Sequence, residues 1–144
     1  DPEGAGTLIS SEVEDNYPSM ITVEQIQAVL QISTRDFSFV AEHHLSQLFQ
    51  LIAEYRLQVN MMQNTAISFI VCVNDIEDRV ANFKEKIEGE FKVRVSRGLE
   101  LITVRHYQKE MLANLRKGKI VLLEEKVRRT IQMVLKEVPM MERK

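Results

Sequence analysis

One arginine and one asparagine in this sequence have the types that a phosphate-hydrolysing site would use. Arg35 follows an apolar, β-branched stretch and would grip the phosphate, while Asn60 would orient a water that attacks an acyl phosphate. Such a site also needs a loop of convergent backbone N–H groups, but residues 34–39 contain no glycine and place Asp36 beside the arginine. We therefore keep a small acylphosphatase-like enzyme only as an alternative.

Two adjacent histidines and a single cysteine are the other residues with reactive side chains. Neighbouring side chains on a helix point about 100° apart, so His43 and His44 are not expected to clamp one metal ion as an i, i+4 pair does. We interpret both as surface or interface residues. Cys72 lies in the apolar stretch 70–73 and is expected to be buried and unreactive. A single cysteine excludes a disulfide scaffold and favours a reducing compartment, so we expect a cytoplasmic protein.

A run of basic residues near the C-terminal end is the only sequence signal for nucleic-acid binding. Two glutamates interrupt this run and no aromatic residues accompany it, which is typical of a solvated surface. A sheet that reads RNA would need aromatic side chains on its two central strands, and the candidate strands here are largely aliphatic. The basic residues are Arg116, Lys117, Lys119, Lys126, Arg128 and Arg129.

The bulk properties limit the chain to one compact core or two very small ones. It has 144 residues, of which 44% are hydrophobic, with a formal net charge of -2 and an isoelectric point near 6.0. This balance provides no basic field for nucleic acid or an anionic membrane, and we expect neither as a partner. No stretch reaches the ~18 apolar residues that a membrane span requires.

The elements in the first two thirds of the chain follow a recognisable order. An apolar strand at 29–33 precedes an amphipathic helix with apolar residues at helical spacing over 45–55. Two strands follow at 57–61 and 67–73, in which Leu57, Val59 and Met61 are expected to share one face. A second helix at 76–88 and a strand at 91–95 complete the order. The sequence therefore predicts an α+β fold of the ferredoxin-like βαββαβ type.

The last third predicts a second, reduced copy of the same plan. A strand over 99–104 and a short helix over 109–114 are expected, and residues 119–136 fit either a helix or a hairpin. The turn-forming Lys117-Gly118-Lys119 favours the hairpin. The predicted domains are a linker at 1–27, a first module at 28–97, a second partial module at 98–138, to which the segment before residue 28 could contribute, and a tail at 139–144. The chain opens without a methionine, so we expect a fragment of a longer protein.

Four segments resemble the regulatory region of aspartate kinases. Residues 1–9, Asp-Pro-Glu-Gly-Ala-Gly-Thr-Leu-Ile, are similar to the end of their catalytic domain. Residues 29–37, Val-Leu-Gln-Ile-Ser-Thr-Arg-Asp-Phe, and 59–64, Val-Asn-Met-Met-Gln-Asn, resemble their first ACT module. Residues 98–104, Gly-Leu-Glu-Leu-Ile-Thr-Val, resemble the entry strand of the second. The similarity extends over nearly the whole chain in the order of the family.

The resemblance implies tandem ACT modules that share strands and bind a small amino acid, lysine or threonine, as feedback effector. Backbone N–H groups at the helix start would bind the effector carboxylate, and carboxamide oxygens would bind its ammonium. Many relatives have an aspartate at the position of Asn60 and a glycine near His43 and His44, so affinity and access are expected to differ. The implied effector-binding residues are Ala41, His43, His44, Leu45, Asn60, Gln63, Asn64 and Thr65.

The resemblance also implies that catalysis belongs to a separate kinase domain. No glycine-rich phosphate loop occurs in the sequence, so we expect neither catalysis, nor a cofactor, nor a metal in this chain, with ATP and magnesium bound by the parent enzyme. The implied partners are the amino-acid effector, a second copy of the chain through the ACT modules, and the upstream kinase domain. An acylphosphatase-like enzyme and an RNA-binding module remain the alternatives.

Overall fold

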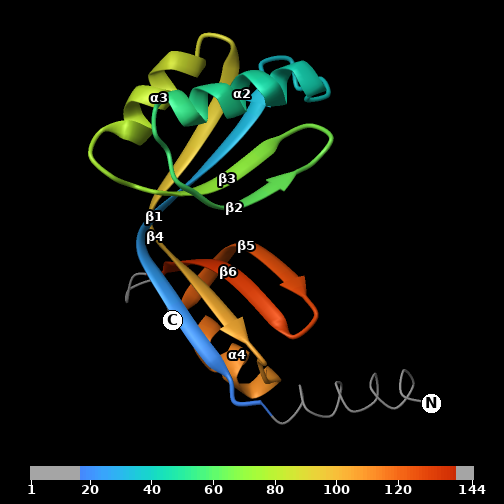
Figure 1. The fold of residues 1–144 in the computed structure, drawn as a ribbon, viewed down its shortest axis with the longest axis vertical. Helices are drawn as coiled ribbons and strands as arrows, with labels where there is room; N and C mark the ends of the chain where they lie inside the picture. The colour runs from blue at the N-terminus through green and yellow to red at the C-terminus, as the bar shows by residue number, and fades with distance from the viewer. Residues whose placement is uncertain (1–16, 139–144) are drawn as a thin grey trace, which may run out of the picture. The chain divides into compact units, whose positions relative to one another are not determined.

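The computed structural model describes residues 17–138, which form two compact units. We call residues 25–99 the central unit, and residues 17–24 together with 100–138 the terminal unit. Two long strands belong to both. In chain order the elements are β1 (Met20–Thr34), α2 (Glu42–Glu54), β2 (Val59–Asn64), β3 (Phe69–Asn74), α3 (Arg79–Ile87), β4 (Phe91–Arg105), α4 (Lys109–Arg116), β5 (Lys119–Val127) and β6 (Thr130–Glu137) (Figure 1).

The central unit is a sheet with the strand order β2-β3-β1-β4, and α2 and α3 cover one face of it (Figure 1). Alternate residues of β1 (Ala28, Leu30 and Ile32) point into the core that these helices close. Their neighbours on β3 lie in antiparallel register, with Leu30 opposite Val71 and Ile32 opposite Phe69. The order β1-α2-β2-β3-α3-β4 confirms the predicted βαββαβ module.

A bulge in β2 changes which of its residues face the helices. Val59 pairs with Val73 and Met61 pairs with Cys72, so Asn60 is an extra residue on this strand. The prediction that Leu57, Val59 and Met61 share a face is therefore wrong. Leu57 and Val59 pack with the helix-covered core. Met61 instead lies with Cys72 on the opposite face of the sheet, which α2 and α3 do not cover and which we call the uncovered face.

Both long strands extend further than their sequence patterns predict. β1 begins at Met20, well before the predicted start near Ala28, so residues 20–27 are strand and not linker. β4 runs from Phe91 to Arg105 without the predicted break at Gly98. Gly98 has φ 70° and Ile26 has φ 57°, close to where each strand passes from one unit to the other. A single residue in the left-handed conformation bends a strand without ending it. Because glycine is common in turns, Gly98 suggested a break between two strands. Residues 1–16 and 139–144, predicted as linker and tail, lie outside the described residues.

The terminal unit contains the predicted hairpin and short helix. β5 and β6 are antiparallel, with Lys119 opposite Glu137 and Val127 opposite Thr130, and β6 also pairs with β4. The helical alternative for 119–136 is thereby excluded. Leu112 of α4 packs on the side chains of β4 and β6, which form a small core of Ile102, Val104, Leu112, Ile131, Met133 and Leu135.

None of the helices formed by residues 17–138 is long and apolar enough to cross a membrane.

Candidate functional site

The start of α2 offers backbone donors to a ligand. Ala41 is the N-cap residue, and its carbonyl oxygen accepts hydrogen bonds from the N–H groups of His44 and Leu45 at 3.0 and 3.2 Å. The N–H groups of Glu42 and His43 precede this bonding pattern and have no partner among the described residues. Two donors at the positive end of the helix dipole can therefore receive a carboxylate.

His44 caps the helix and does not project into solvent. Its Nδ1 accepts a hydrogen bond from the Ala41 N–H at 3.0 Å, so this backbone donor is not open to a ligand. The His44 ring packs edge-on against Phe91, with centroids 5.6 Å apart. The rings of His43 and His44 also contact each other, with centroids 4.0 Å apart, because side-chain rotation overcomes the divergence of their Cα–Cβ directions.

A tight turn between β2 and β3 lies next to the helix start. The N–H of Val40 donates to the carbonyl oxygen of Ala66 at 2.9 Å and joins the two segments. Thr65 and Ser68 close the turn, since the Thr65 N–H donates to the Ser68 carbonyl at 2.9 Å and the Ser68 N–H donates to Thr65 Oγ1 at 3.0 Å. The predicted ligand residue Thr65 is thus already used to shape the turn.

The strand register places the two carboxamides before this turn on different faces. Asn64 is opposite Phe69 and shares the helix-covered face, whereas Gln63 is opposite Ile70 and shares the uncovered face. Asn64 is exposed. Asn64 is therefore the predicted carboxamide that lies on the same side of the sheet as α2 and next to the turn.

Asn60 belongs to a different site at the opposite end of β2. Its Nδ2 donates to Gln27 Oε1 at 2.8 Å and to Asn74 Oδ1 at 2.7 Å. Gln27 Nε2 also donates to Asn74 Oδ1 at 2.7 Å, and the Cys72 thiol donates to Gln27 Oε1 at 3.3 Å. The four positions from Asn60 to Asn64 span about 13 Å of strand. The Val40–Ala66 hydrogen bond therefore places the start of α2 beside the turn that follows Asn64, whereas Asn60 lies apart from both.

Gln27 and Asn74 belong to this hydrogen-bond network, and the sequence did not point to either of them. Gln27 fell in the predicted linker, and nothing in a single sequence links it to Asn60. The bulge in β2 creates the contact, because the extra residue directs the Asn60 side chain toward β1 and β3.

Replacement of Gln27 by alanine is expected to lower the free energy of unfolding by about 1–3 kcal/mol, because buried partners lose their hydrogen bonds. Gln27 is 1% exposed and bonds to two carboxamides and a thiol. Urea unfolding followed by circular dichroism measures the change. Gln31→Ala is the matched control, since Gln31 is exposed on the same strand and its side chain has no partner among the described residues. Equal losses from the two variants would contradict the role of the network.

The phosphate-hydrolysing alternative does not assemble. The Arg35 guanidinium donates to the Gly89 carbonyl at 3.2 Å and to the Glu88 carbonyl, at the end of α3. Asn60 instead bonds to Gln27. Residues 27–34 of β1 lie between these two sites and span about 23 Å. Arg35 and Asn60 therefore cannot hold one phosphate and its attacking water.

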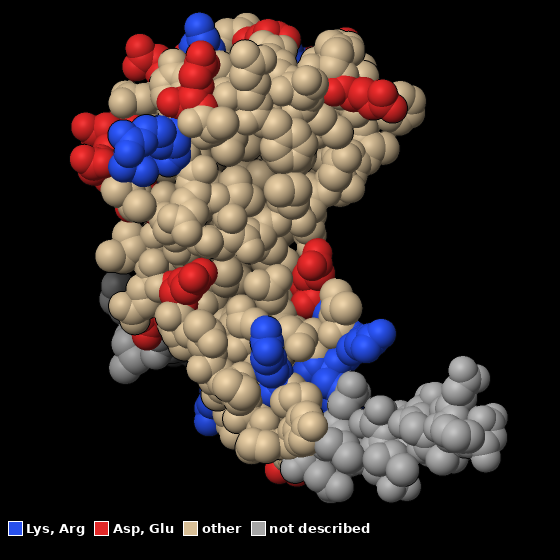
Figure 2. Space-filling model, in the orientation of Figure 1, with Lys and Arg blue, Asp and Glu red and all other residues tan. Residues whose placement is uncertain are grey.

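The RNA-binding and metal interpretations also lack the required residues. The uncovered face of the two central strands, β1 and β3, carries Gln27, Val29, Gln31, Ser33, Ile70, Cys72 and Asn74, with no aromatic platform. In the basic run, Arg116 pairs with Glu124 at 2.6 Å, and Figure 2 shows basic and acidic side chains interspersed on the face in view. Among residues 17–138, no three His, Cys, Asp or Glu side chains gather to hold a metal ion.

Comparisons with solved structures identify the fold. A C-terminal regulatory domain described as that of an aspartate kinase from Porphyromonas gingivalis W83 matches with a TM-score of 0.65 at 12% identity, covering 81% of this chain and 85% of that one. The regulatory subunit of aspartate kinase from Thermus thermophilus matches with a TM-score of 0.57 at 11% identity, covering 80% and 85%.

A complete enzyme shows the same likeness. Escherichia coli aspartokinase III, in complex with lysine and aspartate, matches with a TM-score of 0.60 at 10% identity, and the match covers 79% of this chain and 28% of the enzyme. No protein-family model matches the sequence. No curated protein matches it either.

The chain therefore has an ACT-like, ferredoxin-type fold. More particularly, its fold is that of the regulatory regions of aspartate kinases, which four segments of the sequence also resemble.

Proposed function

We propose that this chain is a regulatory module of the aspartate kinase type, which binds an end-product amino acid, lysine or threonine, for feedback control of aspartate phosphorylation. The fold supports a regulatory role of the ACT type. The observation that carries the proposal is the pair of unpartnered N–H groups of Glu42 and His43, next to the turn that the Val40–Ala66 hydrogen bond fixes. The effector carboxylate binds these N–H groups.

The effector ammonium binds oxygen acceptors on the β2–β3 turn side of the pocket. Asn64 Oδ1 is the predicted carboxamide acceptor on that side, because Asn60 is held in the network with Gln27 and Asn74. Asn60, which the family resemblance implies as an effector ligand, therefore does not contact the effector in this proposal.

The module acts on a separate kinase domain and is not itself catalytic. β2 is an edge strand of the sheet, and its unpaired backbone groups suit pairing with a second copy across a twofold axis. An effector that binds one arrangement of the two copies more tightly shifts the population toward it, in proportion to its differential affinity. The kinase domain of the longer protein would respond to that shift.

Thermal unfolding with lysine, threonine and the other amino acids tests the proposal. A ligand at 100 times its dissociation constant stabilises the folded state by about 2.7 kcal/mol, which raises the melting temperature by several degrees. One of the two named amino acids is expected to produce this shift. If no amino acid raises the melting temperature, the chain does not sense amino acids.

A proline substitution tests the backbone donors directly. Glu42 is the first residue of α2, where proline is tolerated, and Ala41 before it is extended with φ -85° and ψ 169°, as a residue preceding proline requires. Glu42→Pro removes one N–H donor and is expected to weaken effector binding roughly tenfold, the effect of one charge-assisted hydrogen bond. Glu42→Ala removes the same carboxylate but keeps the N–H group, so it serves as the control. Equal affinities of the two variants would exclude the helix start as the carboxylate site.

A further inference from the structure

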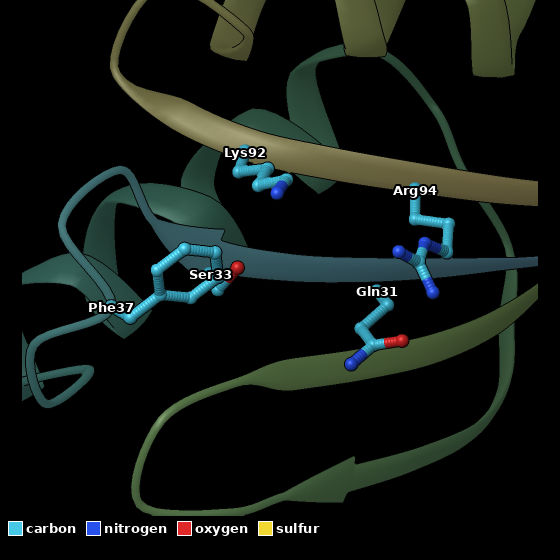
Figure 3. Close-up of a pocket in the computed structure, with 5 residues that line it drawn as sticks. All are labelled: Gln31, Ser33, Phe37, Lys92 and Arg94. Carbon is cyan, nitrogen blue, oxygen red and sulfur yellow. The ribbon is translucent and has the colours of Figure 1, made fainter.

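A polar recess lies on the sheet face of the central unit that α2 and α3 leave uncovered. Gln31 and Ser33 of β1 and Lys92 and Arg94 of β4 line it, and Phe37 closes one end (Figure 3). These strand residues alternate with core residues such as Ile32 and Phe91, so all four side chains point away from the helices. The recess is therefore separate from the helix-covered side, where α2 begins.

Three of the polar side chains in the recess have no partner within the described part of the protein. Gln31, Ser33 and Arg94 form no side-chain hydrogen bond or ion pair with any residue in 17–138. Ser33 is 9% exposed and its hydroxyl has no partner among these residues, so this group remains available to a ligand. By contrast, Arg97 pairs with Asp75 and Arg116 pairs with Glu124. Several hydrogen-bond donors therefore line one space that contains no carboxylate.

Phe37 is held over the recess by an unusual backbone conformation. Its φ is 58°, in the left-handed region that a bulky side chain rarely adopts, and its N–H donates to the Thr34 carbonyl at 3.1 Å. The Lys92 ammonium lies 4.8 Å from the centroid of the Phe37 ring. This contact fixes one positive charge at the edge of the recess, and Figure 3 shows the Arg94 guanidinium reaching from β4 toward Gln31 at the other end.

Charge and size together define what the recess can bind. It is lined by two cations and no carboxylate, so the ammonium of a free amino acid would meet repulsion there. Lys92 and Arg94 are two positions apart on one strand, so their backbones are separated by about 7 Å. The volume is about 160 Å³. A volume of about 150 Å³ suits a group of roughly benzene size, so the recess itself has room for a small anion.

We propose that this recess binds a small dianion, with Lys92 and Arg94 sharing the two negative charges and Ser33 and Gln31 donating hydrogen bonds. A four-carbon dicarboxylate and inorganic phosphate both present this chemistry. The site is distinct from the amino-acid site at the start of α2 and does not require it to be occupied.

Titration of the isotope-labelled chain, followed by amide chemical shifts at constant ionic strength, tests the proposal. Succinate and inorganic phosphate are the two dianions, and acetate is the singly charged control. Saturable shifts confined to residues 31–37 and 92–94 are expected for one or both dianions, with an affinity about tenfold above that of acetate. The relative affinities of succinate and phosphate identify which dianion the recess prefers. Absence of saturable shifts with both dianions would overturn the proposal.

Matched charge-removing variants complete the test. Arg94→Gln and Lys92→Gln are each expected to weaken dianion binding roughly tenfold, the loss of one charge-assisted interaction. Lys86→Gln removes the same charge from an exposed site on α3, outside the recess, and is expected to leave the affinity unchanged. Equal weakening by Lys86→Gln would show nonspecific screening and overturn the proposal. Arg94→Gln is also titrated with lysine and threonine, and the amide shifts of residues 41–45 report binding at the amino-acid site. Loss of binding at one site is thereby measured separately from binding at the other.

Discussion

Replacement of Phe83 by alanine is expected to lower the free energy of unfolding of the central unit by about 3–5 kcal/mol. Phe83 lies in α3, is 0% exposed and packs in the core between the helices and the sheet, with the Tyr55 ring 6.2 Å away. The substitution removes a large apolar side chain and leaves a cavity that close-packed neighbours only partly fill. Since small domains are stable by about 5–15 kcal/mol, such a loss places the unit near its unfolding threshold.

Phe39→Ala is the matched control for this prediction, because it deletes the same atoms from a surface position. Phe39 is 74% exposed in the segment between β1 and α2, so a change within about 0.5 kcal/mol is expected. Urea unfolding followed by circular dichroism and by the signals of buried methyl groups measures both variants. A similar loss in the two proteins would show that Phe83 is not enclosed as described.

The second large effect is expected in the terminal unit, where Ile131→Ala should cost about 2–5 kcal/mol. Ile131 is 0% exposed on β6, lies opposite Val104 of β4, and packs with Leu112 of α4. The core here consists of few residues, so one side chain is a large part of its buried apolar surface. Loss of this residue is therefore expected to unfold the hairpin and α4 together.

Ile120→Ala provides the comparison, since Ile120 lies on the neighbouring strand of the same hairpin and is 52% exposed. Its effect is expected to stay below about 1 kcal/mol. The signals of Tyr107, which packs against the small core, report unfolding of the terminal unit. Those of Tyr55 report the central unit. If Ile131→Ala and Ile120→Ala shift the Tyr107 transition equally, β6 does not form the interior of this unit.

The order of elements was predictable because each has a local pattern. The helical spacing from Leu45 to Tyr55 and the alternation in 91–95 reflect one buried side, and burial gives a helix a period near 3.6 and a strand a period of two. The turn residues around Gly118, which has φ 72°, marked the start of β5, whereas the turn of the hairpin itself lies at Arg128 and Arg129. These parts of the fold needed no long-range information.

Strand lengths and faces were harder to predict, because pairing with distant strands controls them. Residues 20–26 of β1 are all exposed, and although Ile21 and Val23 alternate with polar residues, the prolines, glycines and acidic residues before them favoured a linker. The bulge at Asn60 appears only when β2 is aligned with β3, and it reverses the face of Met61. A period-two pattern assigns faces correctly only while the register is unbroken.

For the candidate sites, too, local features were predictable from the sequence, and groups assembled from distant strands were not. The amino-acid sequence alone was sufficient to predict the ACT-like modules and the helix start near Ala41, because both depend on local patterns and on resemblance over contiguous segments. It did not reveal that Asn60 bonds to Gln27 and Asn74, nor that Gln31, Ser33, Lys92 and Arg94 line one recess. These groups come from strands that are far apart in the chain, and only the register and twist of the folded sheet bring their side chains within reach of one another.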